Sequence, residues 1–292
     1  MEIKVYKVNI FAKTKNGGNP AGVVLDANNL SEKTMKKIAK TLGFSETAFI
    51  MKSDVADFKI RFFTPSEEVD LCGHATIGSF FVLLKNNIVK KGRYTQETKA
   101  GILEVEINED DIIMMTQTNP KYYETIDYSE IAETLNISMD EFNTELPCQI
   151  VSTGLKDIII PLKNNEILNL IKPDFEKVKE LSKKYNVIGY HMFALNEKNN
   201  PKAYCRNLAP LYDIDEEAAT GTSNGALACY LYKHKVINSN EVGNIIFEQG
   251  YSMNKPSMII ASLNIQNDNN IINKVKVGGT ALNIDLIEMK IK

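Results

Sequence analysis

The sequence lacks the features of several large protein classes. Its 34 lysines and arginines nearly balance 37 acidic residues, and a net charge of −3 gives no field that would attract nucleic acid or an anionic membrane surface. No apolar run reaches the roughly 18 residues of a membrane-spanning helix. The opening residues MEIKVYKVNIFAK alternate like a strand and lack the continuous apolar stretch of a secretion signal. We therefore expect a cytoplasmic enzyme or binding protein.

Patterns for binding metals and cofactors are also missing. The four cysteines have no CxxC spacing, which indicates reduced thiols. The three histidines lie far apart, so there is no zinc signature. The stretch GTSNGA lacks the lysine of a phosphate-binding loop and the spacing of a dinucleotide fingerprint. We expect no metal, flavin, nicotinamide or other cofactor.

What the sequence does have is an internal repeat. With 292 residues the chain is long for one core, so two domains are expected. RFFTPSEEVDLCGHATIGSFFVLL has a counterpart in RNLAPLYDIDEEAATGTSNGALACYLY, with the same order of Arg-x-x-x-Pro, acidic patch, glycine turn and apolar run. The turn glycines Gly73 and Gly221 are 148 residues apart, as are the lysines Lys85 and Lys233 that end the apolar runs. The chain therefore contains two similar halves.

A capped amphipathic helix is expected before each repeated stretch. Ser31 and Asp174 are typical N-cap residues, and Gly43 is a typical C-terminal stop. Strand-like segments flank both helices, so we predict an α+β fold with a first half at residues 1–118 and a second half at residues 119–292. The sequence leaves open whether the strand-like C-terminal end pairs back onto the first half.

The two apolar runs, residues 75–84 and 223–232, are apolar on nearly every side, which predicts buried helices. The first-turn N–H groups of such helices need partners, and the glycine turns before them would let a ligand approach the backbone. Two helix starts that face a shared cleft would suit a carboxylate or a developing oxyanion. The alternative is that the glycines are ordinary turn residues, with Asp70 and Thr222 capping their own helices.

One acidic residue stands in an apolar strand. In GFSETAFIMK, alternation places Glu46 on the same face as Phe44, Ala48 and Ile50. Burial would raise the pKa of this carboxyl toward neutrality, which suits a general acid and base. The second half aligns Tyr190 here, so the acid is not part of the repeated pattern. A glutamate at a strand end that reaches water fits the pattern equally well.

Across nearly its whole length the chain resembles the PhzF-like proteins, which are isomerases of phenazine biosynthesis and their relatives. The matching motifs are GNPAGVVL, FSETAF, RFFTPSEEVDLCGHAT and EEAATGTSNGALACYL. The resemblance implies the diaminopimelate epimerase-like fold: two pseudo-symmetric α+β domains, each a β-roll or barrel around a central buried helix, with the active site between them. It also implies cofactor-independent proton transfer and a homodimer.

The resemblance assigns roles to individual residues. Glu46 falls on the family's catalytic glutamate, which removes a proton from one carbon and returns it to another. His74 falls on a histidine that contacts the substrate. Gly73 and Gly221 fall on backbone positions that hold the substrate's polar groups. On this basis we expect an isomerase that acts on a small carboxylate-bearing molecule.

Two positions depart from the family pattern. Glu217 stands where the family commonly has a substrate-contacting aspartate, and Thr222 stands where it has a serine. The longer acid and the added methyl group should reshape the substrate-binding site, which argues against the phenazine-pathway substrate. They also support one alternative, a protein that binds or senses a small acid without turning it over.

A second alternative is an epimerase or racemase of the same fold. Such an enzyme exchanges a proton between two facing thiols. Cys72 is well placed to be the first, but its repeat partner is Thr220, so the second thiol is missing. Cys205 and Cys229 are expected to be core residues.

Overall fold

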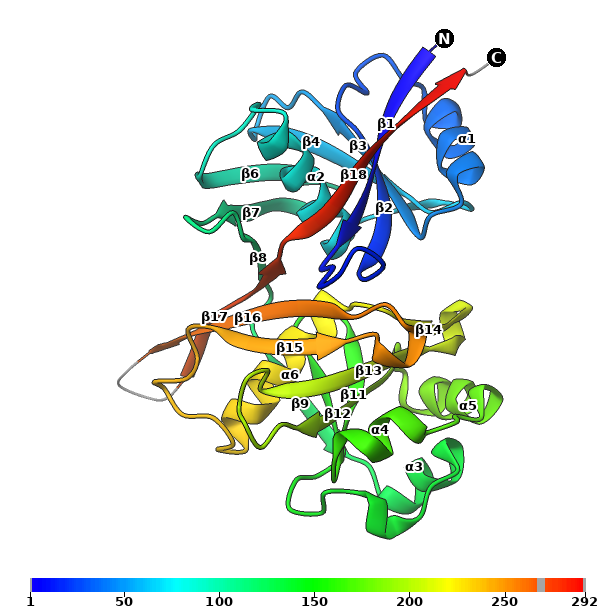
Figure 1. Ribbon diagram of the computed structural model, residues 1–292, viewed down its shortest axis with the longest axis vertical. Helices are drawn as coiled ribbons and strands as arrows, with labels where there is room; N and C mark the ends of the chain where they lie inside the picture. Colours follow the sequence, from blue (N-terminus) through cyan, green and yellow to red (C-terminus); the bar gives the residue numbers. More distant parts are fainter. Residues whose placement is uncertain (1, 267–270, 291–292) are drawn as a thin grey trace. The chain divides into compact units, whose positions relative to one another are not determined.

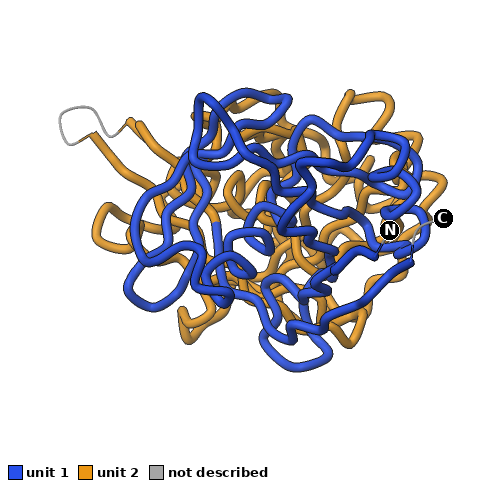
Figure 2. The backbone as a smooth tube through the Cα atoms, turned by 90° about the horizontal axis from the view of Figure 1, so that it is seen from above, with its two compact units in different colours: residues 1–116, 278–292 blue, residues 117–277 orange. Residues whose placement is uncertain are grey.

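The computed structural model describes residues 2–266 and 271–290. The chain forms two compact units (Figure 2). Unit 1 comprises residues 1–116 and 278–292, and unit 2 comprises residues 117–277. No helix among the described residues combines the length and the apolar character needed to cross a membrane.

The C-terminal end belongs to unit 1, whereas the division based on sequence placed it in the second half. The last strand, β18 (Ala281–Lys290), pairs antiparallel with the first, β1 (Glu2–Ile10). Their register runs from Glu2 opposite Lys290 to Ile10 opposite Ala281. This ladder answers the question that the sequence left open, because β18 completes the sheet of unit 1.

Unit 1 surrounds one buried helix with strands (Figure 1). Its remaining elements are β2 (Asn19–Val24), α1 (Glu32–Leu42), β3 (Glu46–Met51), β4 (Phe58–Phe63), β5 (Glu68–Val69), α2 (Gly73–Lys85), β6 (Gly92–Thr98), β7 (Gly101–Ile107) and β8 (Ile113–Gln117). The strands pair in the order β18, β1, β2, β3, β4, β6, β7, β8; β2–β3 and β4–β6 are parallel, and the other neighbours are antiparallel. Residues 75–83 of α2 are all buried and pack on β1, β2 and β3.

Unit 2 repeats this order of pairing. Its elements are β9 (Lys121–Thr125), α3 (Tyr128–Leu135), η1 (Met139–Glu141), β10 (Gln149–Ser152), β11 (Lys156–Leu162), α4 (Asn165–Leu170), α5 (Phe175–Tyr185), β12 (Gly189–Leu195), β13 (Ala203–Ala209), η2 (Pro210–Tyr212), β14 (Ile214–Glu217), α6 (Gly221–Lys233), β15 (Ile245–Gln249), η3 (Tyr251–Met253), β16 (Ser257–Gln266) and β17 (Ile271–Gly279). Strands β9 to β13 pair in succession, followed by β15 and β16, and β11–β12 and β13–β15 are parallel. Residues 223–231 of α6 are all buried.

The helix-capping residues predicted from the sequence are caps in the structure. The side chains of Ser31 and Asp174 accept hydrogen bonds from the first turns of α1 and α5, and Gly43 ends α1 in the left-handed conformation. Cys205 and Cys229 lie in the apolar core of unit 2, as expected. The capped helices therefore connect the parallel strand pairs β2–β3 and β11–β12, while the uncapped apolar helices fill the two interiors.

An arginine–glutamate pair marks equivalent positions in the two units. Arg61 donates two hydrogen bonds to Glu68, at 2.7 and 2.8 Å. Arg206 donates two to Glu216, at 2.9 and 2.8 Å. Both pairs connect a central strand to the short strand that leads into the buried helix. The pairs fix how the residues of one unit correspond to those of the other.

Candidate active site

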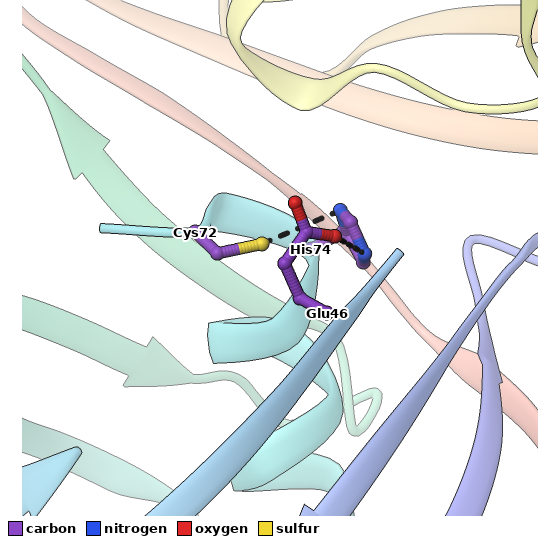
Figure 3. Close-up of side chains that lie close together, drawn as sticks. All are labelled: Glu46, Cys72 and His74. Atoms are coloured by element: carbon purple, nitrogen blue, oxygen red, sulfur yellow. Dashed lines mark hydrogen bonds and ion pairs between the residues drawn. The ribbon is translucent and has the colours of Figure 1, made fainter. Parts of the chain in front are cut away.

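Glu46 and His74 meet at the start of the buried helix of unit 1. Glu46 is the first residue of β3, and His74 is the second residue of α2. His74 Nε2 lies 3.1 Å from Glu46 Oε2, and His74 Nδ1 lies 3.5 Å from Cys72 Sγ (Figure 3). The side chains of Glu46 and His74 are only 19% and 10% exposed. The imidazole therefore contacts both a thiol and a carboxylate in a largely buried position.

The charge state of this cluster differs from the expectation. Burial pushes the pKa of Glu46 up, but the charge and hydrogen bond of His74, together with the Cys72 thiol, outweigh burial and bring that pKa below its usual value. Burial would lower the pKa of His74, yet Cys72 and Glu46 raise it well above the usual value. The predicted rise in the Glu46 pKa is therefore wrong. Sequence cannot reveal that a histidine 28 positions later lies against this carboxylate.

The directions of these pKa shifts favour a charged Glu46 and a charged His74. Burial raises the pKa of the Cys72 thiol, and the neighbouring Glu46 carboxylate adds to the rise, so Cys72 stays protonated near neutral pH. Neither Glu46 Oε2 nor His74 Nε2 has a hydrogen-bond partner among the described residues apart from their mutual ion pair. In the described part of the chain, these two buried atoms are therefore paired only with each other.

The start of α2 has no side-chain cap. Its N-cap residue is Cys72, which makes no capping hydrogen bond, and Asp70 does not fill that position. Gly73, the first helical residue, is half-buried, and a Cβ there would lie 3.4 Å from Met115 Cε. The first-turn amides beside His74 consequently have no competing side-chain acceptor at the N-cap, the arrangement that suits an anionic ligand.

Thiol, imidazole and carboxylate are also ligands of transition metals. The donor atoms of Glu46, Cys72 and His74 all lie within 4.8 Å of one another. Among the described residues, this is the only cluster of at least three histidine, cysteine, aspartate or glutamate side chains close enough to bind one metal ion. These donors could hold a soft divalent ion only if the ion pair opened, because His74 already engages Glu46 and Cys72 through its two nitrogens. In the observed arrangement both imidazole nitrogens of His74 are engaged within the cluster.

The start of α6 in unit 2 carries the other predicted site residues. Glu217 ends β14, and Thr220 is the N-cap of α6, again without a capping hydrogen bond to its helix. Thr220 Oγ1 instead donates to Glu217 Oε2 at 2.7 Å. Gly221 and Thr222 follow as half-buried first-turn residues. The structure thus brings Glu217, Gly221 and Thr222 to one helix start.

Gln249, at the end of β15, supports this turn and was missed in the sequence. Its Nε2 donates to Glu217 O at 2.9 Å and to Thr220 Oγ1 at 3.1 Å, while its Oε1 accepts from Asn224 Nδ2 at 2.9 Å. The stretch QGYSMNKPS, which also matches the PhzF-like pattern, begins with this glutamine, but the stretch alone gave it no role. Only the structure shows that the position of β15 in the sheet brings this side chain to the turn before α6.

The structure also corrects the position in unit 2 that matches Glu46. Phe49 pairs with Arg61, and Met192 pairs with Arg206, so the fourth residue of each strand faces the equivalent arginine. Counting back along each strand from this residue shows that Glu46, the first residue of β3, is equivalent to Gly189, the first residue of β12, and not to Tyr190. The expected alignment was one residue out because the connections in the two units differ in length. Unit 2 still has no acid at this position.

The fold agrees with that of solved structures in two groups of enzymes. A PhzF-family phenazine biosynthesis protein from Bacillus anthracis covers 100% of both chains, with 30% identity and a TM-score of 0.91. A hydroxyproline epimerase from Agrobacterium vitis covers 98% of this chain and 92% of its own, with 12% identity and a TM-score of 0.61, and so shares the fold alone. The chain has the mixed α/β fold of isomerases and epimerases.

Sequence comparison gives the family. Residues 8–285 match the family described as phenazine biosynthesis-like protein, PhzC-PhzF. An uncharacterized isomerase of Clostridium acetobutylicum is 34% identical over 288 residues, 95% of each chain. The trans-2,3-dihydro-3-hydroxyanthranilate isomerase of Pseudomonas chlororaphis is 27% identical over 94% of this chain and 95% of its own. The chain belongs to the PhzC-PhzF family and is one of its isomerases.

Proposed function

We propose that the protein is a cofactor-independent isomerase that moves a proton between two carbons of a small carboxylate-bearing substrate. Glu46 is the general base and then the general acid. The observation that carries this proposal is the ion pair between Glu46 and His74 at the uncapped start of α2. A buried carboxylate that is ionised can accept a proton, and a cation beside it can stabilise the negative charge that forms on the substrate.

The reaction follows from these charges. Glu46 takes the proton from a C–H bond next to an unsaturated or carbonyl-like group, and the electron pair of that bond moves into the unsaturated system. The resulting negative charge is stabilised by the His74 imidazolium and by the first-turn amides of α2. Glu46, now a neutral acid, returns the proton to a different carbon and regains its charge. No electron or group leaves the substrate, so no cofactor is needed.

The start of α6 is assigned to substrate binding. Gly221 and Thr222 offer first-turn amides to a carboxylate, and Glu217 contacts another polar group of the substrate. We infer that the two units are copies of one design, a β-roll around a buried helix, in which one copy has kept an acid for proton transfer and the other supplies binding. The shared strand order and the two arginine–glutamate pairs support this inference.

The two-thiol alternative has little support. Cys72 and Thr220 are the N-cap residues of α2 and α6, so the partner of the thiol in the repeat is a hydroxyl. Burial also raises the pKa of Cys72, which keeps it as the weakly basic thiol. The protein lacks the pair of reactive thiols that this mechanism requires.

Deuterium uptake from D2O tests the proposal. A panel of small unsaturated carboxylates, including the trans-2,3-dihydro-3-hydroxyanthranilate of the Pseudomonas enzyme, is incubated with wild type, Glu46→Gln and the matched control Glu217→Gln. Wild type should introduce deuterium into at least one compound, Glu46→Gln should not, and Glu217→Gln should do so at higher substrate concentration. Equal uptake by wild type and Glu46→Gln would reject the assignment of Glu46. Binding across the panel without exchange in any variant would favour a small-acid sensor.

A further inference from the structure

Four polar side chains are buried together beneath the first turn of α6. Asp157, His191, Asn207 and Ser223 come from β11, β12, β13 and α6, and their exposed fractions are 1%, 0%, 3% and 3%. None of them belongs to the site residues identified above. A carboxyl group in the interior costs several kcal/mol unless it is paired or neutral, so its presence needs an explanation.

Hydrogen bonds join these side chains into a cluster. Ser223 Oγ donates to Asp157 Oδ2 at 2.6 Å and accepts from Asn207 Nδ2 at 3.1 Å. Asn207 Nδ2 also lies 3.3 Å from His191 Nδ1. The buried atoms Asp157 Oδ1 and His191 Nε2 have no hydrogen-bond partner of normal geometry among the described residues. The cluster is therefore incompletely satisfied, directly below a helix start.

The equivalent positions in unit 1 are all apolar. We matched the residues of unit 2 to those of unit 1 by strand register and by the starts of α2 and α6. The registers used are β2–β3 and β3–β4 in unit 1 and β11–β12 and β12–β13 in unit 2. The residues that stand in place of Asp157, His191, Asn207 and Ser223 are Ala21, Ala48, Phe62 and Ala75, all fully buried. The fold can therefore form with a wholly apolar set, and the polar set is a specific property of unit 2.

The surroundings of Asp157 favour its neutral form. Burial raises its pKa to about 7, with a further increase from Glu217, while the Ser223 hydroxyl and the Gly189 backbone act in the opposite direction. His191, on β12, supplies no positive charge, because burial lowers its pKa to about 3. The remaining partners, Asn207 on β13 and Ser223 on α6, do not ionise. Glu217 on β14 is thus the charged group that acts on Asp157, and it repels a second negative charge.

Ser223 links this acid to the proposed binding residues. It is the third residue of α6, directly after Gly221 and Thr222, so its hydroxyl connects Asp157 to the turn that is proposed to bind a carboxylate. An ionised Asp157 would interact with the partial positive charge of the helix start itself and would repel a second anion there. When Asp157 is neutral, the partial positive charge of the helix start can interact with the carboxylate of a ligand.

We propose that Asp157 makes carboxylate binding at the start of α6 proton-linked: the neutral acid supports binding, and its ionised form weakens it. This inference rests on the proposed function of Gly221 and Thr222. Asp157 is then a positioning residue, since it acts through Ser223 and is itself shielded from the substrate. Affinity for a carboxylate should fall roughly three- to tenfold as Asp157 ionises, the size expected for one charge near a helix start.

The first part of the test needs no substrate. Backbone amide signals of Gly221 and Thr222 are followed by NMR from acid to alkaline pH in wild type, Asp157→Asn, Ser223→Ala and the exposed control Asp140→Asn. Wild type and the control should show a titration with a midpoint near neutrality that both cluster variants lose. Absence of this titration in wild type, or its persistence in Asp157→Asn, would overturn the link. This outcome is independent of whether Glu46 catalyses isomerisation.

The second part uses benzoate and its uncharged counterpart benzamide as probes of the same signals. Benzoate should bind wild type more tightly at about pH 6 than at about pH 8.5, on either side of the Asp157 transition, while Asp157→Asn should bind it equally at both. Benzamide should show no such dependence. A benzoate affinity that falls with pH by the same factor in both proteins would overturn the proposal, as would the absence of any shift at Gly221 and Thr222 at about pH 6.

Discussion

The starts of α2 and α6 are built alike but carry different chemistry. Both helices are thirteen residues long, are buried along most of their length and begin at a glycine that follows an N-cap residue without a capping hydrogen bond. Around α2 the polar groups form an ion pair, with Glu46 below and His74 above its usual pKa. Around α6 the buried acid Asp157 accepts a hydrogen bond from the neutral Ser223, and burial together with the nearby Glu217 raises its pKa. In the proposed function, the start of α2 moves a proton and the start of α6 binds a charge.

Loss of the acid in unit 1 should give the largest effect. Glu46→Gln keeps the shape of the side chain but removes the base, so kcat should fall by about 10³- to 10⁴-fold with little change in KM. Glu217→Gln in unit 2 should mainly raise KM, because it alters binding and not proton transfer. Steady-state kinetics on a compound that exchanges deuterium measure both. A fall in kcat of similar size in the two variants would remove the proposed division of roles.

The stability of unit 2 should depend on pH through Asp157. Its pKa in the folded protein, about 7, is above the usual value of 3.8, so stabilisation by the neutral acid is full below pH 4 and is lost as pH rises toward 7. Asp157→Asn should avoid this loss. The free energy of unfolding of the variant relative to wild type should therefore increase by up to about 4 kcal/mol between these limits, at 1.36 kcal/mol for each pKa unit. Denaturant titrations across this range measure it, and a difference that does not change with pH would contradict the raised pKa.

The two arginine–glutamate pairs offer a comparison of the scaffolds. The Arg206 side chain is 5% exposed and also donates to the carbonyls of Leu168 and Ile171, both at 2.9 Å, whereas the Arg61 side chain is 20% exposed. Arg206→Lys should cost about 3 kcal/mol because lysine cannot form this set of hydrogen bonds. Arg61→Lys should cost about 1 kcal/mol. Chemical denaturation measures both values, and equal losses would show that burial does not distinguish the pairs.

Cys72 should show the smallest effect. Its thiol contacts His74 but is protonated and does not carry the charge of the site. Cys72→Ala should therefore change kcat by less than about threefold, since the ion pair between Glu46 and His74 supplies the main stabilisation. The same kinetic assay tests this, with Cys148→Ala as a control for a buried thiol outside the cluster. Abolition of turnover by Cys72→Ala alone would revive a thiol mechanism.

Much of the architecture could be predicted from the sequence because it depends on local signals. Ser31 and Asp174 are N-caps that start α1 and α5 where expected, and Gly43 is the C-cap that ends α1. The apolar runs after Gly73 and Gly221 lack a polar face, which only an interior helix tolerates. The glycine turns could also be placed at helix starts, since the repeat fixed them relative to the apolar runs.

The remaining features depend on which strands lie side by side. Asp157 and His191 lie in two separate, largely apolar segments, and nothing in the sequence shows that β11 and β12 bring both to Ser223. The pKa of Glu46 was expected to rise for the same reason, because the sequence shows its apolar neighbours but not His74. The connections between helices and strands also differ in length between the two units. For this reason the sequence alignment matched Glu46 to Tyr190, whereas the structure matches it to Gly189.

The charge on His74 tests the account most directly. The chain has three histidines, and burial lowers the pKa of both His191 and His234, while the pKa of His74 is raised. Nitrogen NMR of the imidazole rings near neutral pH should therefore show one charged ring, His74, and two neutral rings. In Glu46→Gln the charged ring should titrate at a lower pH. Three neutral rings in wild type would contradict the ion pair on which the proposed proton transfer depends.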